Sequence, residues 1–518
     1  MKASTELFDL VKSMNQSEKR YFKISGSRHT IGEKNIYVRL FDQFDRQAIL
    51  GNNYNEENIK RRFNGERFTE KFYSTKNYLY STVLKSLVSY YSDKEKSSKV
   101  SDLVKGAGIL FQKGLYGQCR KHLNRAKRIA LEYEFFEQVL IILNLELKLT
   151  NTTSFLKESE KNIEKIYKER NIVLKMIDNY YEIQRSYNKI AAIWRKDTPP
   201  AAAEKSFIEK KIRNNPLFEN EKNAFSYKAK LLFYRTLLIY YEIIFAEENI
   251  YYYNKKIVEL LESDHSKMKH DLGMYLHSLN NLLLLQIYLR KYDAAFANIE
   301  KIRDLPNKFP LAKEVNLNTF LIFCFVNTGE MLISIQTGEF NKSLLLAAKI
   351  EKGLNNFIVG YNKLREIQLL YLISYVYFIV GDHNNSLKRI NKILNESQPD
   401  TSPDLMCYVR ILNLVLHYEI GNYGLIESIL ISIYRQSKER GLYKFEKIMF
   451  GFFKKTLHLR SSGENIQLFT ECKNKLESLY DDPYEKNSLE NLDLISWLES
   501  KIEKRTLKEV LLYKSVPK

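Results

Sequence analysis

Proline and glycine are scarce in this sequence. Among 518 residues there are 9 prolines and 19 glycines, so most of the chain must lie in long helices or strands. Apolar residues recur with the period of an α-helix, which favours helices throughout. One ordinary core does not suffice at this length, and the sequence predicts two or three folding units or one extended array of repeats.

Long apolar segments are missing as well. No stretch reaches the roughly 18 apolar residues that a membrane-spanning helix needs, and the most apolar ones, Leu231–Phe245 and Leu369–Val380, are shorter and rich in tyrosine. The first ten residues include Glu6 and Asp9 and lack the apolar core of a signal peptide. We therefore expect no membrane span and a cytoplasmic location.

Motifs for metal, redox or catalytic chemistry are absent. The four cysteines include no pair at two-residue spacing, and the eight histidines follow no zinc-binding pattern. No Gly-rich phosphate loop, Gly-x-Ser-x-Gly elbow or kinase motif occurs. We expect a non-enzymatic protein without metal or cofactor, and buried apolar roles for Cys119, Cys324, Cys407 and Cys472.

A recurring unit is present from Val104 onward: a long apolar helix, a tight turn and a second amphipathic helix. Four of five turns have glycine at the same place, where a helix usually ends in a left-handed residue. Five positions later, where the second helix must approach the first, four of five residues are small. The turn residues are Gly114, Arg290, Gly338, Gly381 and Gly421, and the close-approach residues are Cys119, Ala295, Ser343, Ser386 and Ile426.

In these features the chain resembles the tetratricopeptide repeat (TPR), which places small residues at its eighth, twentieth and twenty-seventh positions. The resemblance covers Leu103–Tyr133 and His265–Lys438, and it extends across Phe135–Asp264 by continuity. The aromatic or histidine rings after the later turns are 48, 43 and 40 residues apart, so the repeats are longer than the family standard of about 34. The resemblance implies an α-solenoid of stacked helical hairpins whose groove holds peptides or proteins.

The organisation predicted from these patterns has five segments. The first hundred residues differ from the rest, because glycines closely separate their short helices, and the stretch from Thr198 to Pro216 breaks a very long helix. The segments are a compact basic helical domain (1–97), a first TPR-like hairpin with long helices (101–197), a linker (198–216), a TPR-like solenoid (217–480) and C-terminal capping helices (481–518).

The first functional hypothesis is a protein-binding scaffold or adaptor that uses the groove of the solenoid. Tyrosine provides a large contact area at low entropic cost, so a tyrosine-rich segment is a candidate lining for this groove. The same tyrosines also suit core packing, and the sequence leaves both readings open. The candidate groove residues are Tyr234, Tyr240 and Tyr241.

The second hypothesis is a nucleic-acid-binding regulator with a basic N-terminal domain. The net charge is +19, and residues 1–100 contain 19 Lys and Arg against 12 Asp and Glu, a balance suited to phosphate contacts. Compositional drift toward lysine and a solvated basic face remain alternatives, and the long segment between Phe63 and Thr75 fits a helix-turn-helix poorly. The candidate residues are Lys60, Arg61, Arg62, Arg67, Lys71 and Lys76.

Overall fold

The computed structural model confirms an all-α protein, with no strand in any part that it describes. Its internal contacts form two compact units, residues 1–181 and residues 182–518. The five-segment division made from the sequence stays a prediction, and the expected break at Thr198–Pro199 lies outside the described residues. These are 5–27, 36–50, 54–92, 95–153, 157–196, 200–309, 317–357, 362–396, 402–436, 442–457, 462–482, 485, 489 and 491–515.

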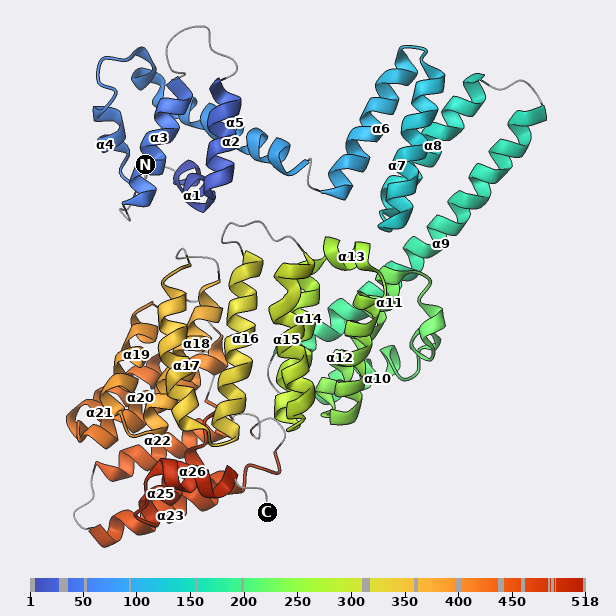
Figure 1. The fold of residues 1–518 in the computed structure, drawn as a ribbon. Helices are drawn as coiled ribbons and strands as arrows, with labels where there is room; N and C mark the ends of the chain where they lie inside the picture. Colours follow the sequence, from blue (N-terminus) through green and yellow to red (C-terminus); the bar gives the residue numbers. More distant parts are fainter. Residues whose placement is uncertain are drawn as a thin grey trace. The chain divides into compact units, whose positions relative to one another are not determined.

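The first unit begins with a small helical bundle. Its core contains Leu7, Leu40, Phe44 and Val83, none of them more than 2% exposed, which are apolar positions expected from the helical period. A second group of helices follows in antiparallel order. The helices are α1 (Glu6–Ser13), α2 (Gln16–Ser27), α3 (Ile36–Ile49), α4 (Glu56–Arg61), α5 (Phe72–Ser92), α6 (Lys96–Gln112), α7 (Tyr116–Glu132), α8 (Phe136–Thr153) and α9 (Lys157–Trp194), which continues into the second unit (Figure 1).

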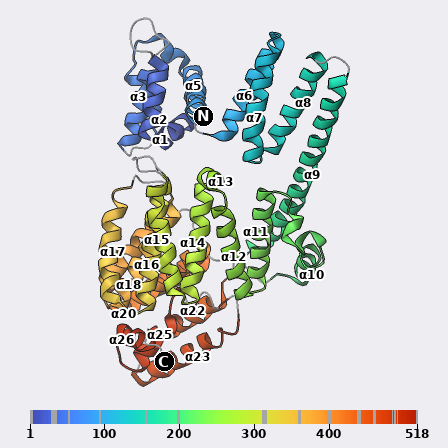
Figure 2. The ribbon, with the colours of Figure 1, turned by 45° about the vertical axis from the view of Figure 1, so that its right-hand side comes forward.

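The second unit is a series of helical hairpins that stand side by side in two views (Figure 1, Figure 2). After α10 (Ala202–Lys211) the hairpins are α11 (Tyr227–Ile243) with α12 (Glu247–Glu262), α14 (Leu272–Tyr288) with α15 (Tyr292–Lys308), α16 (Leu317–Gln336) with α17 (Phe340–Leu354), α18 (Lys363–Ile379) with α19 (His383–Glu396), and α20 (Pro403–Ile420) with α21 (Tyr423–Gln436). The short α13 (His265–His270) precedes α14, and α22 (Lys444–Thr456), α23 (Ser462–Glu477), α25 (Leu494–Ile502) and α26 (Leu507–Ser515) follow.

Each hairpin has a first helix, here called A, and a second helix, called B. The A helices α14, α16, α18 and α20 pack against one another in sequence, and the B helices α15, α17 and α19 each also contact the next A helix. This arrangement buries a continuous core between the two layers, because an isolated hairpin cannot cover its own apolar face.

The turns between A and B helices confirm the sequence prediction. All five predicted turn residues have positive φ, from 56° at Arg290 to 84° at Gly381. At Gly381 the amides of Gly381 and Asp382 donate to the carbonyls of Phe378 and Tyr377, which is the hydrogen-bond pattern of a Schellman cap. The five close-approach residues are all buried, and at two of them a pair of serines bonds across the hairpin, Ser334 with Ser343 and Ser374 with Ser386.

Among the described residues, three further turns have a left-handed residue other than glycine; one of them, Lys504 between α25 and α26, has a φ of 53°. Glu134, between α7 and α8, has a φ of 53°, and Phe245, between α11 and α12, has a φ of 54°. The sequence analysis missed them because a residue with a side chain gives no signal for a left-handed conformation. The hairpin pattern therefore also includes α7–α8 and α11–α12.

Replacing Gly381 or Gly421 with valine is expected to lower the free energy of unfolding by about 1–2 kcal/mol, because a β-branched residue is strained at positive φ. An added Cβ would meet no atom within 4 Å at either position, so the cost is that of the backbone conformation. Arg290→Gly is the matched control, and it should raise stability by about 0.5–1 kcal/mol as it relieves the same strain. Urea unfolding followed by circular dichroism measures all three, and unchanged stability in both valine variants would contradict the turn geometry.

Candidate functional site

The chain's own C-terminal segment covers part of the A-helix layer. Tyr371 and Tyr375 of α18 are buried beneath it: the Tyr371 hydroxyl donates to the Asn491 carbonyl at 3.0 Å, and the Asp493 amide lies 3.4 Å from the Tyr375 hydroxyl oxygen. Burial raises the pKa of both phenols. This face of α18 is therefore occupied intramolecularly.

Helix α25 extends the cover to α20. The indole of Trp497 donates to Glu419 at 2.6 Å, and Lys501 pairs with the same carboxylate. The Trp497 ring is 1% exposed and contacts the ring of Tyr418 at 6.1 Å between centroids. Among the described residues these contacts cover parts of α18 and α20, and none of them involves α14.

Three side chains on successive A helices lie next to one another: His277 on α14, Phe325 on α16 and Arg365 on α18. They are called the row below. The His277 ring meets the Phe325 ring edge-on at 5.5 Å, and the Arg365 guanidinium lies 5.0 Å from the centroid of the same ring. Phe325 is buried, whereas His277 is exposed. The imidazole of His277 and the guanidinium of Arg365 therefore both pack on the buried ring of Phe325.

The register of the repeats brings these side chains together. His277 and Phe325 each stand 13 residues before the left-handed turn residue of their own hairpin, Arg290 and Gly338. The equivalent residue on α18 is Gln368, whose side chain accepts a hydrogen bond from Arg365 at 2.8 Å. Neighbouring A helices thus present equivalent positions to one another.

Arg365 is the unusual member of the row because no carboxylate pairs with it in the described part of the chain. Burial lowers the pKa of its guanidinium. The neighbouring Glu366 pairs instead with Lys363 at 3.0 Å and with Lys392 at 3.6 Å. A partly desolvated guanidinium with spare donors favours a carboxylate ligand, which it can bind through two hydrogen bonds.

His277 adds a second titratable group to the row. Although His277 is exposed on one side, the surrounding protein desolvates its ring, and this desolvation together with the nearby charge of Arg365 lowers the pKa of His277. The shift favours the neutral imidazole at neutral pH. A neutral imidazole does not repel Arg365 and can donate one hydrogen bond to a ligand. The row therefore carries a single positive charge near neutral pH.

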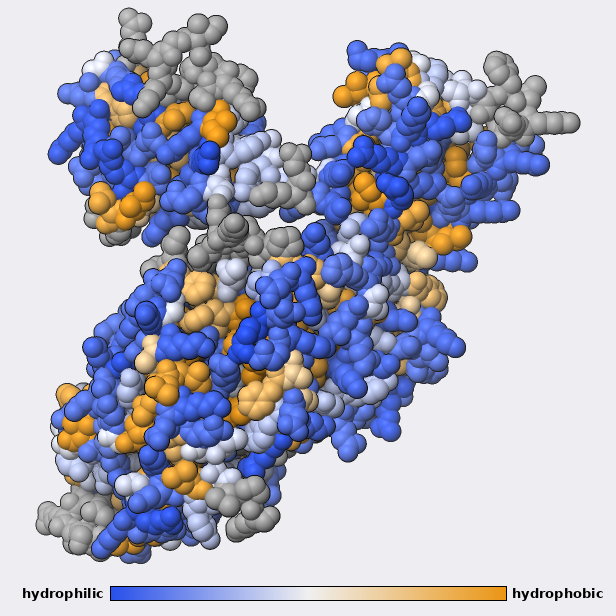
Figure 3. Space-filling view, viewed as in Figure 1, coloured by the Kyte–Doolittle hydropathy of each residue, from blue (hydrophilic) through white to orange (hydrophobic). Residues whose placement is uncertain are grey.

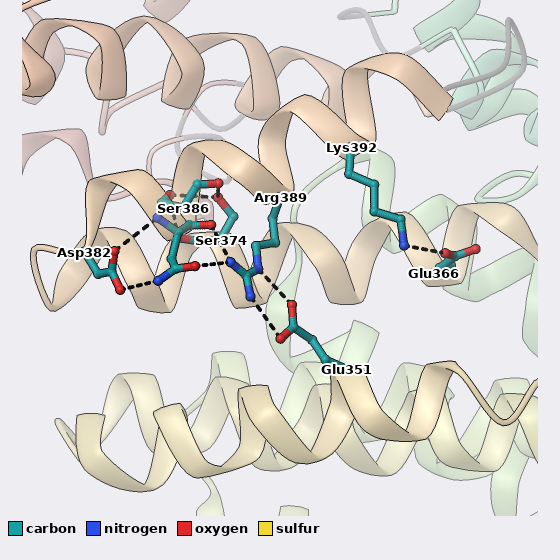
Figure 4. A network of polar contacts seen from close by, with 8 residues as sticks. Glu351, Glu366, Ser374, Asp382, Ser386, Arg389 and Lys392 are labelled. Atoms are coloured by element: carbon teal, nitrogen blue, oxygen red, sulfur yellow. Dashed lines mark hydrogen bonds and ion pairs between the residues drawn. The ribbon is translucent and has the colours of Figure 1, made fainter.

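The neighbouring arginine on α19 shows what a structural ion pair looks like in this protein. Figure 4 shows Arg389 bound to Glu351 of α17 through two hydrogen bonds, at 2.8 and 3.0 Å. It also donates to the Asn385 side chain, which in turn donates to Asp382. Arg389 is thereby satisfied and ties successive hairpins together, in contrast to Arg365.

The tyrosines proposed for the groove lie on α11. Tyr234 is 5% exposed and its hydroxyl donates to Glu221, which fits the core-packing reading. Its place in a groove stays a prediction. Tyr240 and Tyr241 are partly buried, with ring centroids 4.9 Å apart, and Tyr241 stacks on Tyr253 at 5.4 Å. Burial raises the pKa of both Tyr234 and Tyr241.

The predicted phosphate-binding residues of the N-terminal domain do not form one free surface. Lys76 is 4% exposed and pairs with Glu56 at 3.0 Å, an environment that does not favour a phosphate contact. Its role in nucleic-acid binding stays a prediction. Lys60 pairs with the same carboxylate at 2.9 Å. Burial would raise the pKa of Glu56, but hydrogen bonds from Lys60 and Lys76 lower it to about 2.

The other members of that set have separate environments. Arg62 donates to Gln43 at 2.5 Å, while Arg61 and Lys71 are exposed. The side chain of Arg67 lies outside the described residues. The N-terminal charge is thus partly neutralised within the domain.

Three other features of the described residues concern disulfides, metal sites and membrane spans. All four cysteines are buried, as predicted, and none of them forms a disulfide. No three His, Cys, Asp or Glu side chains in the described ranges lie where they could hold a metal ion. By length and composition alone, α16 is long and apolar enough to cross a membrane, so the prediction that no segment of the chain reaches this length was wrong. Its most apolar stretch is 61% buried among neighbouring helices, as in the core of a helical protein.

Comparison with known proteins adds no family: no protein-family model matches the chain, and no curated protein matches it either. The row of His277, Phe325 and Arg365 was not predicted from the sequence. The spacing from the turns was an available signal for His277 and Phe325, which occupy equivalent positions, but not for Arg365, which is three residues before the equivalent Gln368.

Proposed function

We propose that this protein is a non-catalytic, TPR-like scaffold that holds a partner protein against the row of His277, Phe325 and Arg365. The hairpin order, the left-handed turns and the small residues at close approaches support the TPR-like reading. The proposal includes a cytoplasmic location. It includes no cofactor and no metal ion.

The observation that carries the proposal is the Arg365 guanidinium, which contacts Gln368 and the Phe325 ring but has no carboxylate partner among the described residues. Burying a cation without an anionic partner is costly, and in this protein Arg389 has such a partner in Glu351. A partner segment with an acidic side chain or a terminal carboxylate would supply the missing group. The buried Phe325 ring supports the His277 ring and the Arg365 guanidinium from below, and His277 offers a hydrogen bond.

Arg365→Gln is expected to reduce partner capture at least about tenfold, since removing one member of a desolvated ion pair costs several kcal/mol of binding free energy. The full-length variant and wild type are immobilised, exposed to lysate of the native cell, and the bound proteins are quantified by mass spectrometry. Arg435→Gln on α21 is the matched control, because Arg435 is exposed and remote from the row.

Two further measurements make the result interpretable. Arg365→Lys keeps the charge but loses the bidentate geometry, so it should recover only part of the binding. Thermal unfolding checks that each variant is folded. Equal capture by wild type and Arg365→Gln would contradict the proposal.

A further inference from the structure

Helix α7 of the first unit has one apolar and one basic face. Its apolar face is buried in the hairpins with α6 and α8 and includes Cys119, Leu123 and Ala126. The opposite side is exposed, and at 100° per residue its members fall within one stripe along the helix. This stripe, called the basic face below, consists of Arg120, Lys121, Asn124, Arg125 and Arg128.

The positive charge of the basic face is not neutralised by the described residues. Lys121, Arg125 and Arg128 form no ion pair there, and Arg120 has only a 3.4 Å contact with the Thr153 hydroxyl. The helix contains one acidic residue, the terminal Glu132. The lysine that does pair, Lys127, lies off this face and binds Glu146 at 2.8 Å.

This environment differs from that of the N-terminal bundle, where Lys60 and Lys76 share Glu56. Like charges at adjacent turns of a helix destabilise it. Four cations lie on one face of α7, and the one acidic residue of the helix, Glu132, is at the end of that face and forms no ion pair with them among the described residues. The remaining excess of positive charge suits an external polyanion. Figure 3 shows hydrophilic side chains over much of the surface at α7.

The composition of the face distinguishes between polyanions. Three of its four cations are arginines, which bind phosphate oxygens through paired hydrogen bonds, and Asn124 adds an uncharged donor of the kind that contacts nucleic-acid backbones. A membrane surface would also need apolar side chains to insert. The basic face itself has none, and in α7 one large apolar side chain is exposed, Leu131 at the end of the helix.

The geometry favours a duplex over a single strand. From Arg120 to Arg128 the face is about 12 Å long, which matches roughly three to four base-pair steps of a duplex. Single-strand binding uses aromatic side chains that stack on bases, and the basic face has none. We infer that the basic face of α7 binds the phosphate backbone of a nucleic-acid duplex without reading its sequence.

The test uses the full-length protein and a fluorescent DNA duplex of mixed sequence, about 20 base pairs long, with binding followed by anisotropy between about 50 and 200 mM salt. Wild type should bind at low salt and lose affinity steeply as salt rises. The variant Arg120→Gln/Arg125→Gln/Arg128→Gln should bind at least about tenfold more weakly, with its log–log salt slope reduced by about 3. The substituted side chains are exposed, so circular dichroism should show unchanged helicity.

Lys60→Gln/Arg61→Gln/Arg62→Gln is the matched control, with the same change of net charge in the N-terminal bundle. It should retain most of the affinity. Equal losses in the two triple variants would overturn the inference, because they would reflect total charge rather than this face. Failure of wild type to bind the duplex would also overturn it, as would unchanged binding in the α7 variant.

A parallel arm tests the other anionic partners. Wild type is mixed with vesicles that contain about one-fifth phosphatidylserine, and separately with polyglutamate. Stronger binding to either of these than to the duplex would overturn the inference. Duplex binding that exceeds both, and is lost in the α7 variant, supports it.

Discussion

Trp497→Ala is expected to lower the free energy of unfolding of the second unit by about 3–5 kcal/mol, the range for truncating a large buried aromatic residue. The Trp497 ring lies at centroid distances of 5.9 Å from both Phe452 and Phe469 and 6.3 Å from Phe453. Its removal would leave a cavity where α25 meets α20, α22 and α23, and would also remove the indole hydrogen bond to Glu419.

The chain provides its own control, because it contains only two tryptophans. Trp194, at the end of α9, is 47% exposed, and Trp194→Ala should change stability by less than about 0.5 kcal/mol. Urea unfolding followed by circular dichroism compares the two. A cost below about 1 kcal/mol for Trp497→Ala would mean that α25 does not pack on the A helices.

Glu242→Gln is expected to raise the free energy of unfolding by about 1–3 kcal/mol at pH 8. Burial raises the pKa of Glu242 from its ordinary value of 4.5 to about 7, and no hydrogen bond or ion pair of its carboxylate occurs among the described residues. The residue is in the last turn of α11, where the helix dipole also disfavours a negative charge. Glutamine removes the cost of ionising this group in the folded state.

The pH dependence follows from the direction of the pKa shift. The folded state holds the proton up to about pH 7, whereas the unfolded chain releases it near 4.5, so wild-type stability falls relative to the variant across this interval. Near pH 4.5 the two proteins should be nearly equal. Glu427→Gln, at an exposed position of α21, should show no such divergence, and a constant difference for Glu242→Gln from pH 4.5 to 8 would contradict the shift.

Most of the helical fold was predictable from local sequence patterns. Glycine at Gly114, Gly338, Gly381 and Gly421 identified four hairpin turns, because glycine adopts a left-handed conformation without strain. The aligned position of Arg290 identified a fifth. Turns at Glu134 and Phe245 were missed because their conformation depends on the packing of the flanking helices, which overrides the preference of the residue.

The candidate site was much less predictable. His277, Phe325 and Arg365 come from three separate hairpins, and their proximity depends on how consecutive A helices align. The ion-pair partner of each charged group was equally unpredictable from the sequence. Lys76 and Arg365 are both basic, but of these two only Lys76 has a carboxylate beside it in the described structure. Local patterns carry no information on such long-range pairing.

By itself, the sequence determined that the chain is helical, where five of its hairpins turn, and that its cysteines are buried, because periodicity, backbone strain and spacing act over a few neighbouring residues. The tertiary structure decided which charges are neutralised, which tyrosines belong to the core, and which A-helix faces the C-terminal helices cover. These properties depend on desolvation and on contacts between residues far apart in the chain, such as Tyr371 with Asn491. Only the packed helices bring those groups within range of one another.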